Sequence, residues 1–341
     1  MAFEDFDWEK LLSRIAAGTC TPFIGAGACA DYLPSGAALA EAFAEEHDYP
    51  FPEGGRDLSR VTQFMAVDHR DAQFPKNAMT RFFDLSPMTG AASTFRFQRE
   101  QFQLKKPSGR LNGLIVDRKI PRFAEESGIH SVLADINSTL YLTTNYDDYM
   151  RRALVARGRN ALSDFCRWTP QLFNTLSSPF DNGYIPSESK PLVYHLHGHA
   201  SNAKSLVVTE DDYLDYTAYI AQDLARSKEG KGKKVMLPGF IRTAMTDHLL
   251  LFVGYRVRDE NLRVVLRTLW QTLSPSSDQL NLAVQLSMEP GNTSAEVERM
   301  RVYLEKHYEI SLRLHVYWGD AREFARELRK RLPASPGWAN P

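Results

Sequence analysis

The sequence predicts an α/β fold: a doubly wound, mostly parallel sheet with an inserted, mostly helical module. A short apolar run leads into a glycine turn and then a helix near the N-terminus. In the second half of the chain, strand-like apolar runs alternate with helical stretches. Strands that alternate with helices form parallel sheets, because each crossover helix returns the chain to the same edge.

The first unit is a helix, a strand and a second helix. Phe3–Ala17 has an amphipathic helical pattern, and Thr21–Ile24 is a short apolar strand that runs into Gly25-Ala26-Gly27. A second helix is expected from Gly36, with Ser35 as its N-cap. Strand, glycine turn and helix are the opening of a nucleotide-binding unit.

The region from 50 to 135 has a different character. Asp57–Asp68 and Asn77–Leu85 have helical patterns, and basic residues gather between Arg96 and Arg122. We therefore divide the chain into an α/β domain formed by 1–49 and 136–332, an inserted helical module at 50–135 and a flexible tail at 333–341.

The α/β alternation resumes after the insertion. A helix is expected from about Asp147, and another from Glu210 with Thr209 as its cap. The remaining expected strands are Leu140–Thr143, Leu192–Leu196, His248–Val253, Leu280–Leu286 and Leu312–Tyr317, separated by helices at Asp259–Leu273, Ser294–His307 and Ala321–Leu332.

Composition excludes several classes. The net charge of −1 over 341 residues exerts no global attraction on nucleic acid or acidic membranes. The three cysteines, Cys20, Cys29 and Cys166, form no C-x-x-C pair, so this chain cannot build a four-cysteine zinc ribbon. The N-terminus lacks signal-peptide character, and no run approaches the about 18 apolar residues of a membrane span. We expect a cytoplasmic protein without membrane contact.

Polar residues follow two of the expected strands. Asn145 lies in Thr143-Thr144-Asn145-Tyr146-Asp147, where it can orient a ribose hydroxyl and a water, or simply cap the next helix. His197 lies in His195-Leu196-His197-Gly198-His199, where an imidazole can act as a general base near neutral pH.

The histidine segment has two other interpretations. Some of its imidazoles can be ordinary polar core residues. The His-x-His spacing also suits a metal, with Asp247 or Asp259 completing the ligands, although no third-ligand motif has recognisable spacing. The expectation is that no metal is bound.

Glycines mark two turns. Gly25-Ala26-Gly27 can bring the backbone close to a pyrophosphate, or can be a tight turn without a ligand. Phe252-Val253-Gly254-Tyr255 ends a buried strand. Arg256 and Arg258 follow closely and can either reach a phosphate or be solvated.

Together and in this order, these segments resemble the sirtuin (silent information regulator) superfamily. The resemblance gives Asn145 and His197 catalytic roles. It gives cofactor contacts to Gly25, Ala26, Gly27, Asp147, Gly254 and Tyr255, and places Asp320 and Ala321 of Trp318-Gly319-Asp320-Ala321 near adenine. The zinc cysteines of the deacetylases are missing, and Asp31-Tyr32-Leu33-Pro34-Ser35-Gly36 stands where their proline-aspartate-phenylalanine-arginine segment is expected.

The sequence is more similar to the sirtuin-like NADases of bacterial antiphage systems, including those associated with HerA-type ATPases. This resemblance implies a Rossmann-like fold and a glycohydrolase that cleaves NAD to nicotinamide and ADP-ribose. It also implies a protein partner such as a HerA-type ATPase. A homo-oligomer is expected as well, because a constitutive NAD glycohydrolase would exhaust its host and must be controlled by assembly or by access to its pocket. The alternatives are a protein deacylase, a non-catalytic nucleotide-binding subunit and a metal-dependent hydrolase or nuclease.

The basic stretches are candidates for regulation. Arg96 to Arg122 and Arg226 to Lys234 are expected to meet an acidic partner or nucleic acid, or to form a solvated face. Nucleic-acid contact would then be indirect with respect to catalysis.

Overall fold

Seven parallel strands form one sheet in a computed structural model that describes residues 5–84, 109–116, 123, 128–228, 236–255, 281–285 and 294–333. The strand order is β3-β4-β2-β1-β5-β6-β7. This confirms the predicted α/β class and the parallel sheet. The strands are β1 (Cys20–Ile24), β2 (Leu140–Thr143), β3 (Leu162–Phe165), β4 (Leu192–His195), β5 (Leu249–Val253), β6 (Asn281–Gln285) and β7 (Leu314–Trp318).

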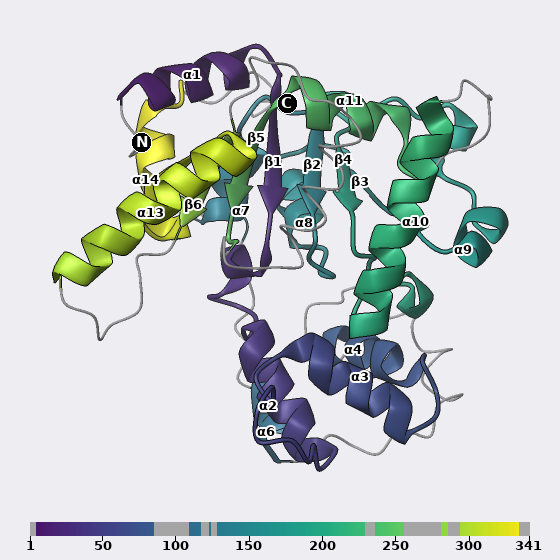
Figure 1. Ribbon diagram of the computed structural model, residues 1–341. Coiled ribbons are helices and arrows are strands. Elements are labelled where there is room, and N and C mark those ends of the chain that lie inside the picture. The colour runs from purple at the N-terminus through teal and green to yellow at the C-terminus, as the bar shows by residue number, and fades with distance from the viewer. Residues whose placement is uncertain are drawn as a thin grey trace.

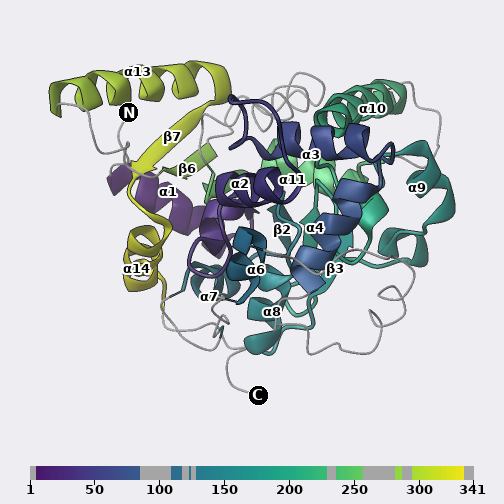
Figure 2. The ribbon, with the colours of Figure 1, turned by 90° about the horizontal axis from the view of Figure 1, so that it is seen from below.

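Two helical layers cover the sheet. Helices α1 (Asp5–Ala16), α7 (Ile129–Ala134), α8 (Tyr149–Ala156) and α14 (Ala321–Arg331) pack on one face. Helices α10 (Glu210–Lys228), α11 (Gly239–Asp247) and α13 (Ser294–Leu312) pack on the other, as Figure 2 shows. Side chains alternate between faces along each strand, and in β5 Leu251 joins the first core while Leu250 and Phe252 join the second.

A third apolar cluster lies beyond the carboxyl ends of the strands. It contains side chains of α2 (Gly36–Glu46), α3 (Leu58–Asp68), α4 (Phe74–Asp84) and α6 (Gly109–Val116), together with Leu206 and Val208. These helices lie below the sheet, on the side toward which β1 runs (Figure 1). The contacts put α2 with this helical layer, and the division of the chain into domains stays a prediction.

Most element boundaries agree with those predicted, and the expected caps are present. Ser35 Oγ accepts from the Ala38 N–H, and Thr209 Oγ1 accepts from the Asp212 N–H. The expected helix Asp259–Leu273, the basic residues Lys105, Lys106, Arg118 and Lys119, the residues 229–235 and the tail 334–341 lie outside the described residues.

The structure also differs from the sequence-based elements in places. The helix expected to end at His307 continues to Leu312, so β7 begins two residues later than predicted. Elements without an individual sequence-based prediction are β3, α6, α7, α9 (Pro170–Thr175), α11 and the short 3-10 helices η1 (Ala26–Cys29), η2 (Pro179–Asn182) and η3 (Ala203–Ser205). No helix in the described ranges has both the length and the apolar character required to cross a membrane.

Candidate functional site

The carboxyl ends of four neighbouring strands lie in register at one edge of the sheet. Ile24 of β1 pairs with Thr143 of β2 and Val253 of β5, and Thr143 pairs with His195 of β4. Gly25, Asn145, His197 and Gly254 follow these ends within two positions of the last strand residue, while Gly27 and Asp147 follow at three and four positions. The fold therefore brings Gly25, Asn145, His197 and Gly254 to the same edge, where doubly wound sheets bind their ligands.

The glycine turn packs tightly against the end of β5. The Gly25 N–H donates to the Val253 carbonyl and the Gly27 N–H donates to the Gly254 carbonyl, both at 2.8 Å. A Cβ on either Gly25 or Gly27 would lie 2.8 Å from the Gly254 oxygen. Gly254 itself has φ +79°, and its Cβ would lie 2.2 Å from the Ala28 nitrogen. These glycines are thus required for contact between two backbone turns, whether or not a pyrophosphate binds there.

Tyr255 stabilises the same contact between the ends of β1 and β5. Its hydroxyl lies 2.9 Å from the Ile24 carbonyl, to which it donates, and 2.9 Å from Thr144 Oγ1. Its ring packs edge-on against Phe23 at 5.5 Å between centroids. Tyr255 therefore joins the ends of β1, β2 and β5.

Asn145 is buried, and three of its four polar groups have protein partners. Its N–H donates to Thr143 Oγ1 at 2.9 Å, its carbonyl lies 2.8 Å from His195 Nδ1, and Nδ2 donates to Cys29 Sγ at 3.3 Å. These contacts leave the side-chain oxygen Oδ1 to accept a hydrogen bond from a ligand, as far as the described residues show.

The thiol of Cys29 explains the orientation of that amide. Cys29 Sγ donates to the Asp147 carboxylate at 3.5 Å, and a carboxylate can only accept. The sulfur must then accept from Asn145, which turns the Nδ2 end inward. Burial, followed by the charge of Asp147, raises the pKa of Cys29 well above its usual value, so the thiol stays protonated. The sequence predicts no site role for Cys29, which lies two residues after Gly27.

Asp147 is half-buried, and both of its carboxylate oxygens are hydrogen-bonded within the protein. Its Oδ1 accepts from the N–H of Tyr149, the first residue of α8, at 2.9 Å, while Oδ2 faces Cys29. Burial raises the pKa of Asp147 above its ordinary value. Asp147 therefore links the first turn of α8 to the thiol beside Asn145, and its contact with a cofactor stays a prediction.

His197 lies between two aromatic rings of α10. The rings of Tyr213 and Tyr216 meet the imidazole edge-on, at 5.4 and 5.2 Å between centroids. Burial lowers the pKa of His197 to about 4, so the ring is neutral at physiological pH and can accept a proton. The next residue, Gly198, has φ +89°, and a Cβ there would lie 2.2 Å from the Ser205 carbonyl oxygen. The histidine-glycine pair therefore combines a proton acceptor with a turn that only glycine permits.

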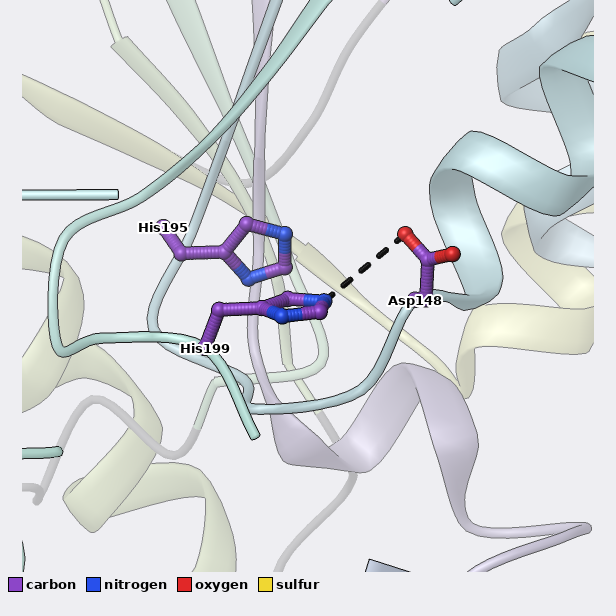
Figure 3. A group of neighbouring side chains, drawn as sticks. All are labelled: Asp148, His195 and His199. Carbon is purple, nitrogen blue, oxygen red and sulfur yellow. Dashed lines mark ion pairs between the residues drawn. The ribbon is translucent and has the colours of Figure 1, made fainter. Parts of the chain in front are cut away.

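The two other histidines of this segment, His195 and His199, lie close to Asp148 (Figure 3). One side-chain nitrogen each from His195 and His199 and one oxygen of Asp148 lie within 4.8 Å of one another, a spacing suitable for a metal ion. The sequence offered Asp247 or Asp259 as the third ligand. Asp247 instead ends α11 before the amino end of β5, at the opposite edge of the sheet, and Asp259 lies outside the described residues. Asp148 was not predicted.

Hydrogen bonds already occupy much of this cluster. Arg151 Nε donates to both Asp148 oxygens, and Ser163 Oγ donates to Oδ1 at 2.8 Å. Burial alone would raise the pKa of Asp148, but His199 and Arg151 together hold it well below its usual range. The Ser201 N–H donates to His199 Nδ1 at 3.1 Å, so Nδ1 accepts and the ring proton lies on Nε2, 3.8 Å from Asp148 Oδ1. Nε2 of His195 and Nε2 of His199 have no hydrogen-bond partner among the described residues, so the group keeps two nitrogens that can bind a metal ion.

Asp320 and Ala321 lie farther along the same edge, after β7. Asp320 caps α14 by accepting from the backbone N–H groups of Arg322 and Glu323. Arg322 forms an ion pair with Asp31, which follows the glycine turn. Contact of Asp320 and Ala321 with adenine stays a prediction.

A parallel sheet with a glycine turn and polar side chains at its carboxyl edge is the arrangement found in dinucleotide-binding α/β proteins. Comparison with known families matches residues 139–311, half of the chain, to the SIR2-like domain. The chain therefore belongs to the SIR2-like family, as the sequence resemblance predicted.

One relative has an assigned activity. The NAD(+) hydrolase ThsA of Acinetobacter baumannii (strain 532279) is 27% identical over 161 residues. The match covers 44% of this chain but only 27% of the relative, so the chain spans about a quarter of that protein's length.

Proposed function

We propose that this chain binds NAD at the carboxyl edge of its sheet and hydrolyses the bond between nicotinamide and ribose. The products are nicotinamide and ADP-ribose. The observation that carries the proposal is the placement of Asn145 and His197, which follow paired strand ends beside the glycine turn. Membership of the SIR2-like family and the likeness to an NAD(+) hydrolase support it.

Asn145 orients the sugar. Its Nδ2 end is held by Cys29, so Oδ1 is presented as an acceptor for a ribose hydroxyl or for the attacking water. Holding a reactant in this way speeds the reaction, because the entropy cost of orienting it is met on binding to a preformed site. The pyridinium nicotinamide is a good leaving group, so positioning and charge stabilisation account for most of the required rate enhancement.

His197 accepts the proton. Because burial lowers its pKa to about 4, the neutral imidazole dominates at physiological pH and can deprotonate a ribose hydroxyl or the water. The bond from the ribose carbon to the nicotinamide nitrogen breaks, water supplies the new oxygen, and one proton is released. The turn Gly25-Ala26-Gly27, with Asp147, Gly254 and Tyr255 around it, forms the cofactor-binding part of the proposal, and Asp320 and Ala321 form its adenine side.

The cellular role extends the same proposal. By its resemblance to antiphage NADases, the chain would act in defence by depleting NAD. It would do so as a homo-oligomer controlled by a protein partner such as a HerA-type ATPase. The cytoplasmic location, predicted from the composition and the N-terminal sequence, is part of the same proposal.

The test is incubation of the purified chain with NAD, with chromatographic analysis of the products and calorimetry of NAD binding. Asn145→Ala and His197→Ala are each expected to lower turnover by about two to four powers of ten. His248→Ala is the matched control, because His248 lies at the amino edge of the sheet beside Thr21.

Three outcomes would contradict the proposal. Near-normal turnover by folded His197→Ala removes its catalytic role. Nicotinamide release that strictly requires an acylated peptide identifies a deacylase. Tight NAD binding without cleavage, with and without the partner, identifies a nucleotide-binding subunit.

A further inference from the structure

His195 joins the two segments that carry the proposed catalytic residues. It ends β4 opposite Thr143 of β2, two residues before His197. Its side chain is fully buried, and its Nδ1 lies 2.8 Å from the carbonyl of Asn145, fifty residues earlier in the chain. A carbonyl only accepts, so Nδ1 carries the proton of the neutral ring and donates it to Asn145.

The other hydrogen bonds of Asn145 connect it to β1 rather than to β4. The Asn145 N–H is bound by Thr143 Oγ1, which itself donates to the Ile24 carbonyl, and Nδ2 is bound by Cys29. His195 therefore supplies the side-chain hydrogen bond that links Asn145 to the strand preceding His197.

The imidazole of His195 is itself held in place. The His199 ring packs edge-on against it, at 4.5 Å between centroids and an interplanar angle of 75°. His199 in turn faces Asp148, with 3.8 Å from Nε2 to Oδ1, and Arg151 and Ser163 fix that carboxylate (Figure 3). His199, itself beside Asp148, thus packs against the ring that binds the Asn145 carbonyl.

We propose that His195 is a positioning residue that sets the separation of Asn145 and His197, with His199 and Asp148 supporting its ring. The inference rests on the proposed function. The sequence also allowed His195 to be an ordinary polar core residue. In the proposal it instead acts by binding the backbone carbonyl of Asn145.

Two substitutions separate the hydrogen bond from the rest of the imidazole. Asn at position 195 places an N–H close to the original Nδ1, whereas Leu fills similar space without a donor. His195→Leu is expected to lower kcat for NAD cleavage by about tenfold to a hundredfold with little change in KM, because a buried carbonyl loses its partner and Asn145 shifts. His195→Asn is expected to keep kcat within about threefold of the native value, since the donor is retained.

Equal losses in the two folded variants would overturn the proposal, as would native kcat in His195→Leu. Activity that disappears with a chelator and returns with Zn²⁺ would also overturn it in favour of a metal site.

Nuclear magnetic resonance of the histidine rings supplies a readout that is independent of turnover. We expect His195 to be protonated at Nδ1 and His199 at Nε2. A His195 ring protonated at Nε2 would contradict the proposed hydrogen bond even if NAD is cleaved. Conversely, the expected tautomers in a chain that never cleaves NAD would show that the proposed function alone has failed.

Discussion

At the residue scale, the glycines of the site are explained by packing before any ligand is considered. The turn at Gly25 and Gly27 contacts the backbone of Gly254 so closely that an added Cβ on any of the three collides with main-chain atoms. A branched side chain at Gly25 or Gly27 would therefore damage the fold locally. Loss of NAD affinity in such a variant would not by itself locate the pyrophosphate.

Gly254→Ala is expected to lower the free energy of unfolding by about 3 kcal/mol or more, because it combines a left-handed backbone conformation with a severe overlap. Denaturant titration measures the loss. Gly36→Ala is the control, since a Cβ at this first residue of α2 meets nothing within 4 Å. The control should be neutral or stabilising by about 0.5–1 kcal/mol. Equal stability of the two variants would refute the packing argument.

At the scale of elements, the helical layer is tied to the segment that follows His197. Thr62 Oγ1 of α3 donates to the Val208 carbonyl at 3.0 Å, and Gln63 exchanges two hydrogen bonds with Asp211. Lys76 of α4 forms a buried ion pair with Asp212 of α10, at 2.6 Å between Nζ and Oδ1. The layer thereby holds the connection between β4 and α10, and so the site depends on elements outside the sheet.

The Lys76–Asp212 pair offers a direct test of this attachment. Lys76→Met leaves a buried carboxylate without its cation and is expected to cost about 3–5 kcal/mol in the free energy of unfolding. Adding Asp212→Asn removes the uncompensated charge and should restore much of that loss. A double-mutant cycle in denaturant measures the coupling, and strictly additive effects would show that the pair does not stabilise the attachment.

At the scale of the whole molecule, three buried histidines make stability sensitive to acid. Burial lowers the pKa of His130 and His197 to about 4 and that of His195 to about 3. In the unfolded chain each has a pKa of about 6.5. Below that pH the unfolded state binds protons at these histidines and the folded state does not. The free energy of unfolding therefore falls as the pH drops from about 6.5 toward 4.

Each of the three histidines is expected to lower the free energy of unfolding by on the order of 3 kcal/mol over that pH range. Urea titrations at successive pH values should show the free energy of unfolding falling from about pH 6.5 downward. His130→Phe should reduce the slope by one proton. A free energy of unfolding that is level between pH 6.5 and 4.5 would contradict the assigned burial.

Local pattern was sufficient for the central strands and the main site positions. β1, β2, β4 and β5 are short apolar runs that end at glycine or polar residues, so their boundaries and the placement of Asn145 and His197 after them could be predicted. Caps at Ser35 and Thr209 followed for the same reason, since a side chain that bonds a backbone group three residues away is a local feature.

Only the tertiary structure decided the rest. β3 has no apolar periodicity, and its buried Asp164 is balanced by Arg167, a contact that a hydropathy pattern does not register. Cys29 and Asn145 are 116 residues apart, and His195 and Asn145 are fifty apart. Their roles arise from hydrogen bonds that exist only after the strands have paired. Sequence pattern reports short-range preference, whereas the geometry of this site depends on which distant segments the parallel sheet places side by side.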